Sequence, residues 1–205
     1  MRLLLFMLFT VLAPSAAFAA APDAGQIMVG AGDILRGHFT EQRHLKGFNG
    51  PMNSRGHFVV APKYGLIWGM EKPFPTTTVI TPAGLAQSVN GVSIMHLPAQ
   101  KMPFLLHLYN MLGGALAGNW KELETDFTVV RSEDGEGWQV ILVPRRTDNP
   151  AMPFSSITVS GHRFVENVVL LKSDGDSDTL TFLNEVISSS PLTAAESLVF
   201  NSVGP

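Results

Sequence analysis

Short runs of β-branched and aromatic residues, each ended by proline or glycine, constrain the fold more than any other feature of this sequence. Roughly ten such runs follow one another, among them RGHFVVA, GLIWGME, TTTVITP, DFTVVRS, WQVILVP, SSITVS, RFVENVVLLKS and TLTFLNEVI. Runs of this length and composition are typical of strands. Strands joined by short turns pair as an antiparallel meander, and a sheet of this size curls or closes on itself. The sequence therefore predicts a mainly β protein with one strongly bent antiparallel sheet of about ten to eleven strands.

Two local signals predict details of this sheet. Asn90-Gly91 separates LAQSV from VSIMHL and is a strong signal for a two-residue hairpin turn. In ILRGHFTEQRHL, side-chain alternation places Leu35, Gly37, Phe39 and Glu41 on one face of the strand.

Helical patterns occur at two places. A short helix is expected from Asp23 to Leu35, although two glycines weaken it. The longer pattern is KMPFLLHLYNMLGGALAGNWKELE, in which Pro103 suits a first helical turn and apolar positions cover most of the circumference. Such a helix needs an apolar surface, so the segment from Lys101 to Glu124 is expected to lie across the mouth of the bent sheet. Its Gly113-Gly114 pair is either a close-packing point or the hinge of a lid.

The first nineteen residues, MRLLLFMLFTVLAPSAAFA, have the pattern of a secretory signal peptide, with one basic residue, a short apolar stretch and an Ala-Phe-Ala cleavage sequence. We therefore expect residues 1–19 to be removed and residues 20–205 to form a single domain. The sequence contains no cysteine, so neither disulfides nor an acylated cysteine is expected in the exported chain. The expected location is the periplasm of a Gram-negative bacterium.

Charge and missing motifs argue against several classes of function. After cleavage, 13 basic side chains stand against 17 acidic ones, and a net charge of −4 offers no strong field for nucleic acid. The patterns G-x-S-x-G and H-E-x-x-H and the Walker loop are absent, so no catalytic residue, enzyme activity or cofactor is expected. The histidines are scattered over different segments, which favours surface or packing roles over a metal site: His38, His44, His57, His96, His107 and His162.

One acidic cluster has a spacing close to that of a calcium loop. Asp174, Asp176 and Asp178 occupy alternate positions, and Glu185 falls where the last ligand of such a loop would lie. Thr179, however, occupies the position at which that loop requires glycine, and TLTFLNEVI alternates like a strand. A solvated hairpin turn is therefore preferred, and no metal is expected.

The order and spacing of three segments resemble the LolA-type outer-membrane lipoprotein carrier family. The first segment is GHFTEQRHLKGFNGPMNSRGHFVVAPKYGLIWGMEKPFPTTTVITPAGL, with a Phe and a Gln on its first strand, a Pro-centred turn and a Trp. The second is NWKELETDFTV, after the helical insertion, and the third is VENVVLLKSDGDSDTLTFLNEV, which is similar to the family's C-terminal hairpin. Together they span most of residues 37 to 188.

The resemblance implies a half-open antiparallel β-barrel with a helical lid. It also implies a role in carrying acylated lipoproteins across the periplasm, from an inner-membrane exporter to an outer-membrane receptor, without making or breaking a bond. At about 0.8 kcal/mol per methylene, one long acyl chain costs on the order of 10 kcal/mol to expose to water. A carrier must offset most of this cost and still release its cargo, which soft apolar contacts and a movable lid allow. A monomer is expected.

Ten apolar positions are expected to line the cavity or the lid, and ordinary core packing is the alternative for each. They are Phe39, Phe58, Val60, Leu66, Trp68, Met70, Val79, Phe104, Leu108 and Leu112. In the family, the residue before the turn proline is typically an arginine that tunes retention against release. Here Ala61 precedes Pro62, and Lys63 follows it. Either Lys63 replaces the cation or the handoff differs, and the cargo is then a lipoprotein, another acylated lipid or a polyene-type envelope product.

Two other classes of function remain. A regulatory protein of the RseB type uses a similar half-barrel to sense lipoproteins and to bind a protein partner, but such regulators carry an additional domain for which a mature chain of this length has no expected room. A lipid-acting enzyme would need His and Asp side chains to meet at the cavity mouth. Converging polar groups in the cavity favour an enzyme, and a dry apolar cavity favours a carrier.

Overall fold

The computed structural model describes residues 29–101, 121–134, 137–145 and 154–203. In chain order the strands are β1 (Ile34–His44), β2 (Met52–Ala61), β3 (Gly65–Lys72), β4 (Thr76–Thr81), β5 (Gly84–Val89), β6 (Val92–Pro98), β7 (Phe127–Asp134), β8 (Gly137–Pro144), β9 (Phe154–Gly161), β10 (Val165–Lys172) and β11 (Ser177–Ser188). Two 3-10 helices, η1 (Ala99–Lys101) and η2 (Lys121–Thr125), lie between β6 and β7, and α2 (Ala194–Asn201) follows β11. In this described part, no helix has the length and apolar character needed to cross a bilayer.

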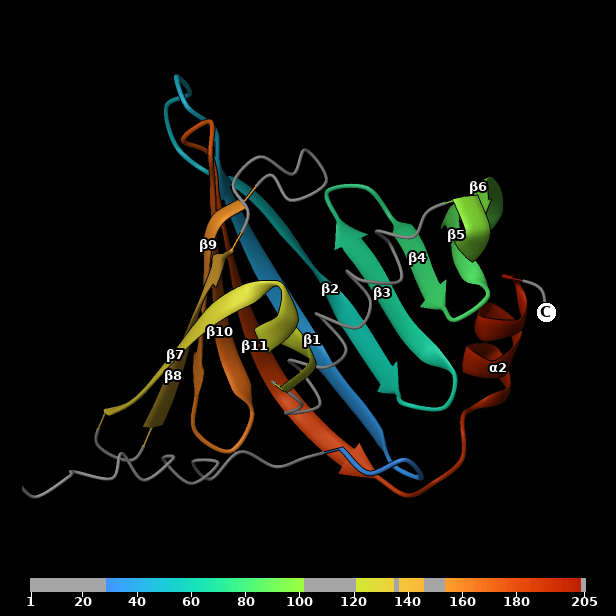
Figure 1. The fold of residues 1–205 in the computed structure, drawn as a ribbon. Helices are drawn as coiled ribbons and strands as arrows, with labels where there is room; N and C mark the ends of the chain where they lie inside the picture. The colour runs from blue at the N-terminus through green and yellow to red at the C-terminus, as the bar shows by residue number, and fades with distance from the viewer. Residues whose placement is uncertain (1–28, 102–120, 135–136, 146–153, 204–205) are drawn as a thin grey trace, which may run out of the picture.

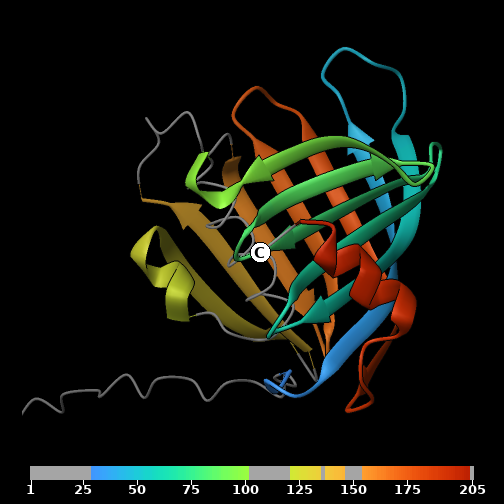
Figure 2. The ribbon, with the colours of Figure 1, turned by 90° about the vertical axis from the view of Figure 1, so that its right-hand side faces the viewer.

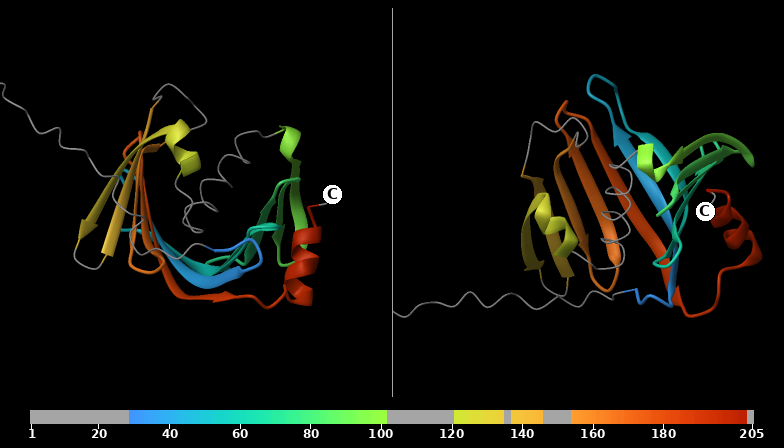
Figure 3. Two further views of the ribbon diagram at one scale, coloured as in Figure 1. Left: turned by 60° about the horizontal axis from the view of Figure 1, so that its bottom comes forward. Right: turned by 45° about the vertical axis from the view of Figure 1, so that its right-hand side comes forward.

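All eleven strands form one sheet in the order β6-β5-β4-β3-β2-β1-β11-β10-β9-β8-β7. Two meanders, β1 to β6 and β7 to β11, are joined where β1 pairs antiparallel with β11. The strands curve into a trough, seen from the side in Figure 1 and along its length in Figure 3. Since β6 and β7 are the edges of the sheet, the barrel is open, and the expected half-open antiparallel barrel is confirmed. Of the segment from Lys101 to Glu124 that was expected to cover the mouth of the sheet, residues 102–120 lie outside the described part.

Turn residues place the strands as expected, with one correction. Asn90 and Gly91 have φ angles of 51° and 78°, the left-handed pair that a tight hairpin turn requires, and Val89 opposes Val92. The expectation of a helix up to Leu35 is wrong for residues 29–35. The N–H of Asp33 donates to the carbonyl of Gly30 in a turn, and β1 begins at the next residue. The two glycines favour the turn over a helix.

The sheet has two faces, each with its own apolar cluster. The inner face of the trough carries the larger cluster, which runs through both meanders and includes Leu35, Phe39, Phe58, Leu66, Val140, Val159, Val168 and Phe182. The outer face carries a smaller cluster formed with α2, and its members are Ile34, Val59, Ala61, Ile67, Val79, Ala86, Phe200 and Val203. Figure 2 shows α2 lying against the outside of the sheet, over the first meander. Neighbouring residues of one strand therefore serve different clusters.

Helix α2 is fixed to the outer face by a cap and an ion pair. Thr193 accepts a hydrogen bond from the N–H of Glu196, and the Glu196 carboxylate accepts one from the N–H of Thr193, which forms a capping box. Arg36 of β1 donates to both oxygens of the same carboxylate, at 2.7 and 2.8 Å. The hydrogen bond from Arg36 is the main reason that the pKa of Glu196 falls to about 2. The cap of α2 is thereby tied to the central strand of the sheet.

One side of α2 packs against the sheet and the other faces solvent, so substitutions on the two sides are expected to change stability by different amounts. Phe200 is buried in the outer-face cluster, whereas Leu198 is 73% exposed. Phe200→Ala is expected to lower the free energy of unfolding by about 3 kcal/mol, because it removes a buried ring and leaves a cavity. Leu198→Ala, the matched control, is expected to change it by less than about 0.5 kcal/mol. Urea denaturation measures both values, and equal effects would show that α2 is not packed as described.

Candidate functional site

Four aromatic rings from four strands meet on the inner face. The rings of Phe39 and Trp68 are stacked with centroids 3.9 Å apart, and the Phe58 and Phe182 rings meet edge to face at 5.3 Å. Trp68 lies 6.4 Å from Phe58 and 6.2 Å from Phe182, so its ring contacts all three phenylalanine rings. The three phenylalanines are buried and Trp68 is half-buried. We call these four residues the aromatic cluster.

Strand register brings the aromatic cluster together. Phe39 of β1 opposes Phe182 of β11, and Phe58 of β2 opposes Trp68 of β3. Gly37 makes room for the Phe58 ring, because a Cβ atom at position 37 would lie only 2.7 Å from two atoms of that ring. Residues that oppose each other across antiparallel strands lie on the same face, so the cluster is a property of the sheet and not of a loop.

The structure places most of the expected cavity positions of the sheet on the inner face. Phe39, Phe58, Val60, Leu66 and Trp68 belong to the inner cluster, and Met70 shares their face since it follows Trp68 by two residues. The expectation that Val79 lines the cavity is wrong. Val79 opposes Ile67 and belongs to the outer-face cluster under α2. Phe104, Leu108 and Leu112 lie outside the described residues.

The turn between β2 and β3 lies away from the aromatic cluster. The Ala61 side chain is buried in the outer-face cluster, whereas Pro62 and Lys63 are exposed. All three line a small cavity of about 130 Å³, together with residues 31–34 and 191–192. The Lys63 ammonium therefore lies at the end of the sheet, at a surface cavity, and not among the four rings.

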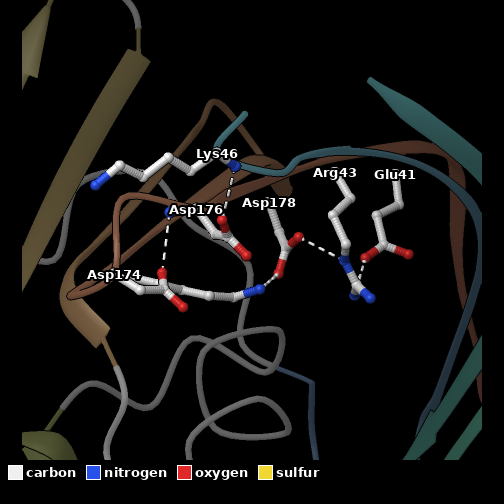
Figure 4. A network of polar contacts seen from close by, with 7 residues as sticks. Glu41, Arg43, Lys46, Asp174, Asp176 and Asp178 are labelled. Atoms are coloured by element: carbon white, nitrogen blue, oxygen red, sulfur yellow. Dashed lines mark hydrogen bonds and ion pairs between the residues drawn. The ribbon is translucent and has the colours of Figure 1, made fainter. Parts of the chain in front are cut away.

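An ionic network lies on the inner face at the far end of β1 (Figure 4). Arg43 donates from Nε to Asp178 and from Nη2 to Glu41, both at 2.8 Å, and Lys172 Nζ lies 2.9 Å from the other oxygen of Asp178. The Glu41 and Asp178 side chains are largely buried. Two acids and two bases balance each other, so this end of the trough is polar without offering an unpaired charge.

The acidic side chains of the hairpin that follows β10 are engaged in contacts within the protein. Asp178 is held by Arg43 and Lys172, while Asp174 and Asp176 accept hydrogen bonds from backbone N–H groups of the turn and of Lys46 (Figure 4). Among the described residues, no group of three or more His, Asp or Glu side chains has the arrangement of a metal site. The expected hairpin turn is confirmed.

Three histidines of the described residues make separate contacts that do not converge on one site. His57 pairs with Glu71 and His162 with Glu166, each at 3.1 Å, and the ring of His96 bonds the carbonyl of Val203. His107 lies outside the described residues.

Two inner-face residues were missed by the sequence analysis: Phe182, which completes the aromatic cluster, and Glu185. Asn184 has a φ of 55°, and the register between β1 and β11 shifts between Arg36 and His38. This bulge turns Glu185 to the inner face, where its Cγ would lie 3.1 Å from a Cβ atom at Gly37. Its Oε1 atom is buried and has no hydrogen-bond partner among the described residues. Burial first, and then the charge of Glu166, raise the pKa of Glu185 to about 7.

No protein-family model and no curated protein matches the sequence. Similar solved structures include a LolA superfamily protein from Nitrosomonas europaea, which is 8% identical with a TM-score of 0.44, over 84% of this chain and 93% of that chain. An outer membrane lipoprotein-sorting protein domain from Vibrio parahaemolyticus is 12% identical with a TM-score of 0.36, over 84% and 91%. The first names the family that the sequence resembles.

A third similar structure is the MucA/MucB complex of Pseudomonas aeruginosa. It is 12% identical with a TM-score of 0.47, over 80% of this chain and 56% of that chain. At such low identities and TM-scores, the function has to be derived from the residues of this chain.

The raised pKa of Glu185 predicts a pH-dependent stability. Since the pKa is 4.5 in the unfolded chain and about 7 in the folded one, the folded protein holds this proton more tightly, and the unfolding free energy falls as pH rises through 7. Glu185→Gln removes the titrating carboxyl group, so this decrease in the unfolding free energy with pH should disappear. The variant is expected to match the wild type near pH 4 and to be more stable near pH 8, as measured by urea denaturation.

The control for this comparison is Glu133→Gln, which removes the same charge from an exposed position on the edge strand β7. It is expected to leave the pH profile of the wild type unchanged. A stability difference between Glu185→Gln and wild type that is the same at both pH values would contradict the assignment.

Proposed function

We propose that the protein is a periplasmic carrier whose inner face shields the acyl chains of a lipoprotein, or of another acylated envelope lipid, during transfer to the outer membrane. The observation that carries the proposal is the aromatic cluster on the inner face of an open, curved sheet, with Trp68 half-buried. Such rings offer large apolar area without hydrogen-bonding demands, which suits a flexible hydrocarbon chain. In this role no bond of the cargo is broken, so we propose that the protein is not an enzyme.

The arrangement of polar groups supports shielding over catalysis. At the Arg43 end of the inner face the charges are already paired, and the described histidines with an acidic partner, His57 and His162, are exposed. A nucleophile with an adjacent general base is what a lipid-acting enzyme requires, and the contacts of the described residues hold no such pair on the inner face.

The separation of the two faces also supports a carrier. Outer-face residues such as Ile67 and Phe200 pack α2 against the sheet, so folding stability does not depend on the inner face alone. Because the outer face also stabilises the fold, the inner face can bind and release a chain without unfolding the sheet. Weak and numerous apolar contacts favour release, since no single strong bond has to break.

The cellular setting belongs to the same proposal. Residues 1–19 act as the signal peptide, and residues 20–205 form one domain in the periplasm. The partners are an inner-membrane exporter that loads the cargo and an outer-membrane acceptor that receives it. The alternative is a lipoprotein-sensing regulator with a protein partner, which the binding experiment below separates from the carrier.

Substitutions at two adjacent residues of β3 test the proposal. Trp68 belongs to the aromatic cluster on the inner face, whereas Ile67 is buried on the outer face. Trp68→Ala is expected to weaken binding of a triacylated lipopeptide about tenfold, because it removes a large apolar contact surface. Displacement of a fluorescent fatty acid from the mature protein measures this affinity.

Ile67→Ala is the matched control on the same strand. It is expected to lower the free energy of unfolding by about 3 kcal/mol and to leave the lipopeptide affinity unchanged. Equal losses of affinity in the two variants would argue against an inner-face site. If the wild type bound neither lipopeptide nor fatty acid, the carrier would be rejected in favour of the regulator.

A further inference from the structure

Glu185 lies at the opposite end of the inner face from the ionic network. Along β1, the inner-face residues run from Leu35 through Gly37 and Phe39 to Arg43, and Glu185 contacts this row beside Gly37. The six residue-to-residue steps from Gly37 to Arg43 span about 20 Å at about 3.3 Å per step. The aromatic cluster occupies the Gly37–Phe39 end of this row, next to Glu185, because Phe58 opposes Gly37 and Phe182 opposes Phe39. One acyl chain of a bilayer leaflet extends about 15 Å, so the row is long enough for such a chain.

The Glu185 carboxyl group differs from every other inner-face acid described above, because it has no partner. Glu41 and Asp178 are both held by Arg43, whereas Oε1 of Glu185 is buried without a hydrogen bond in the part of the chain that the structure describes. A buried acceptor without a partner costs free energy. A ligand group that donates a hydrogen bond to it would remove this cost.

The strands around Glu185 supply only negative charge to it. On β1, Arg36 and His38 alternate to the outer face, where Arg36 is held by Glu196. On β2, Phe58 faces it, while the neighbouring His57 is directed to the outer face and pairs with Glu71. On β10, the nearby group is Glu166, which interacts with Glu185 as a like charge and itself lies 3.1 Å from the exposed ring of His162.

We propose that Glu185 binds a protonated amine at the polar end of the cargo, and that the acyl chain of the same molecule extends over the aromatic cluster toward Arg43. The proposal rests on the proposed acyl-binding function and narrows its ligand to an amphiphile that carries a primary amine. A cation is favoured because the two nearby acids, Glu185 and Glu166, create a negative potential. A carboxylate headgroup would be repelled, and an alcohol would gain only a neutral hydrogen bond.

The proposal makes the binding of an amine depend on pH. Only the ionised Glu185 forms the ion pair, and with a pKa of about 7 it is largely protonated at pH 5.5 and largely ionised at pH 8. The apparent dissociation constant is the intrinsic one divided by the fraction of protein in the binding-competent state. Amine binding should therefore tighten as pH rises through 7. Binding of an alcohol with the same chain should stay constant.

The test uses three probes with one chain length, dodecylamine, dodecanol and dodecanoate, each below its micelle concentration or solubility limit, with the mature protein. Isothermal titration calorimetry at pH 5.5 and pH 8 is expected to show dodecylamine binding about 30-fold tighter at pH 8, and dodecanol binding unchanged. Glu185→Gln is expected to abolish the pH effect on dodecylamine and to keep the dodecanol affinity. Glu166→Gln retains Glu185 and is expected to shift the midpoint of the pH effect downward.

The outcomes separate this inference from the function on which it rests. If all three probes bind with affinities that do not respond to pH or to Glu185→Gln, the amine site is wrong and acyl binding stands. If dodecanoate binds best, the site prefers a negatively charged headgroup and the amine site is also wrong. If no probe binds at either pH, both the amine site and the acyl-binding function are overturned. The wild-type pH comparison decides the question even if a variant fails to fold.

Discussion

The pairing of β1 with β11 is the interaction on which the rest of the structure depends. It runs from Ile34 opposite Ser188 to His44 opposite Ser177 and joins two meanders that are otherwise separate in the sequence. It places Phe39 beside Phe182 and Arg43 beside Asp178, and its bulge directs Glu185 inward. The loop that it closes is nearly the whole described chain, so the pairing is entropically costly and depends on the apolar cluster beneath it. The aromatic cluster and the ionic network are both consequences of this one register.

The two faces of the sheet make different kinds of contact. The outer face is completed by α2, whose cap is held by the bond between Arg36 and Glu196. The inner face carries the aromatic cluster, a balanced ionic network and Glu185, an acid that has no partner among the described residues. Because side chains alternate along a strand, each strand contributes to both kinds of contact. A carrier built this way can change its inner-face contacts while the packing of α2 stays intact.

Much of this architecture could be predicted from the sequence, because its signals are local. Strands bounded by proline or glycine, the Asn90-Gly91 turn, and the shared face of Phe39 and Glu41 depend on a few neighbouring residues, and the structure has all of them. Val79 was misplaced for a different reason. A run such as TTTVI does not say which face is buried, and a shift of one residue moves every side chain to the other face.

Glu185 and Phe182 show a second limit of prediction from sequence. Strict alternation from Phe182 puts position 184 on the inner face, but the bulge at Asn184 gives that place to Glu185. The left-handed φ of Asn184 is a conformation that asparagine tolerates well, yet a single asparagine in a strand is a weak signal. The environment of Glu185 also depends on Gly37 and Phe58, which are distant in sequence. Such a site becomes visible only when the register is known.

The most direct test of the central claim is native mass spectrometry, with lipid extraction, of the mature protein purified gently from a periplasm. The carrier account predicts a bound acylated species, whose mass distinguishes a lipoprotein from a smaller lipid and whose headgroup reveals whether it carries an amine. A protein that is free of lipid as purified, and that remains so after mixing with lipoproteins and envelope lipids, would contradict it.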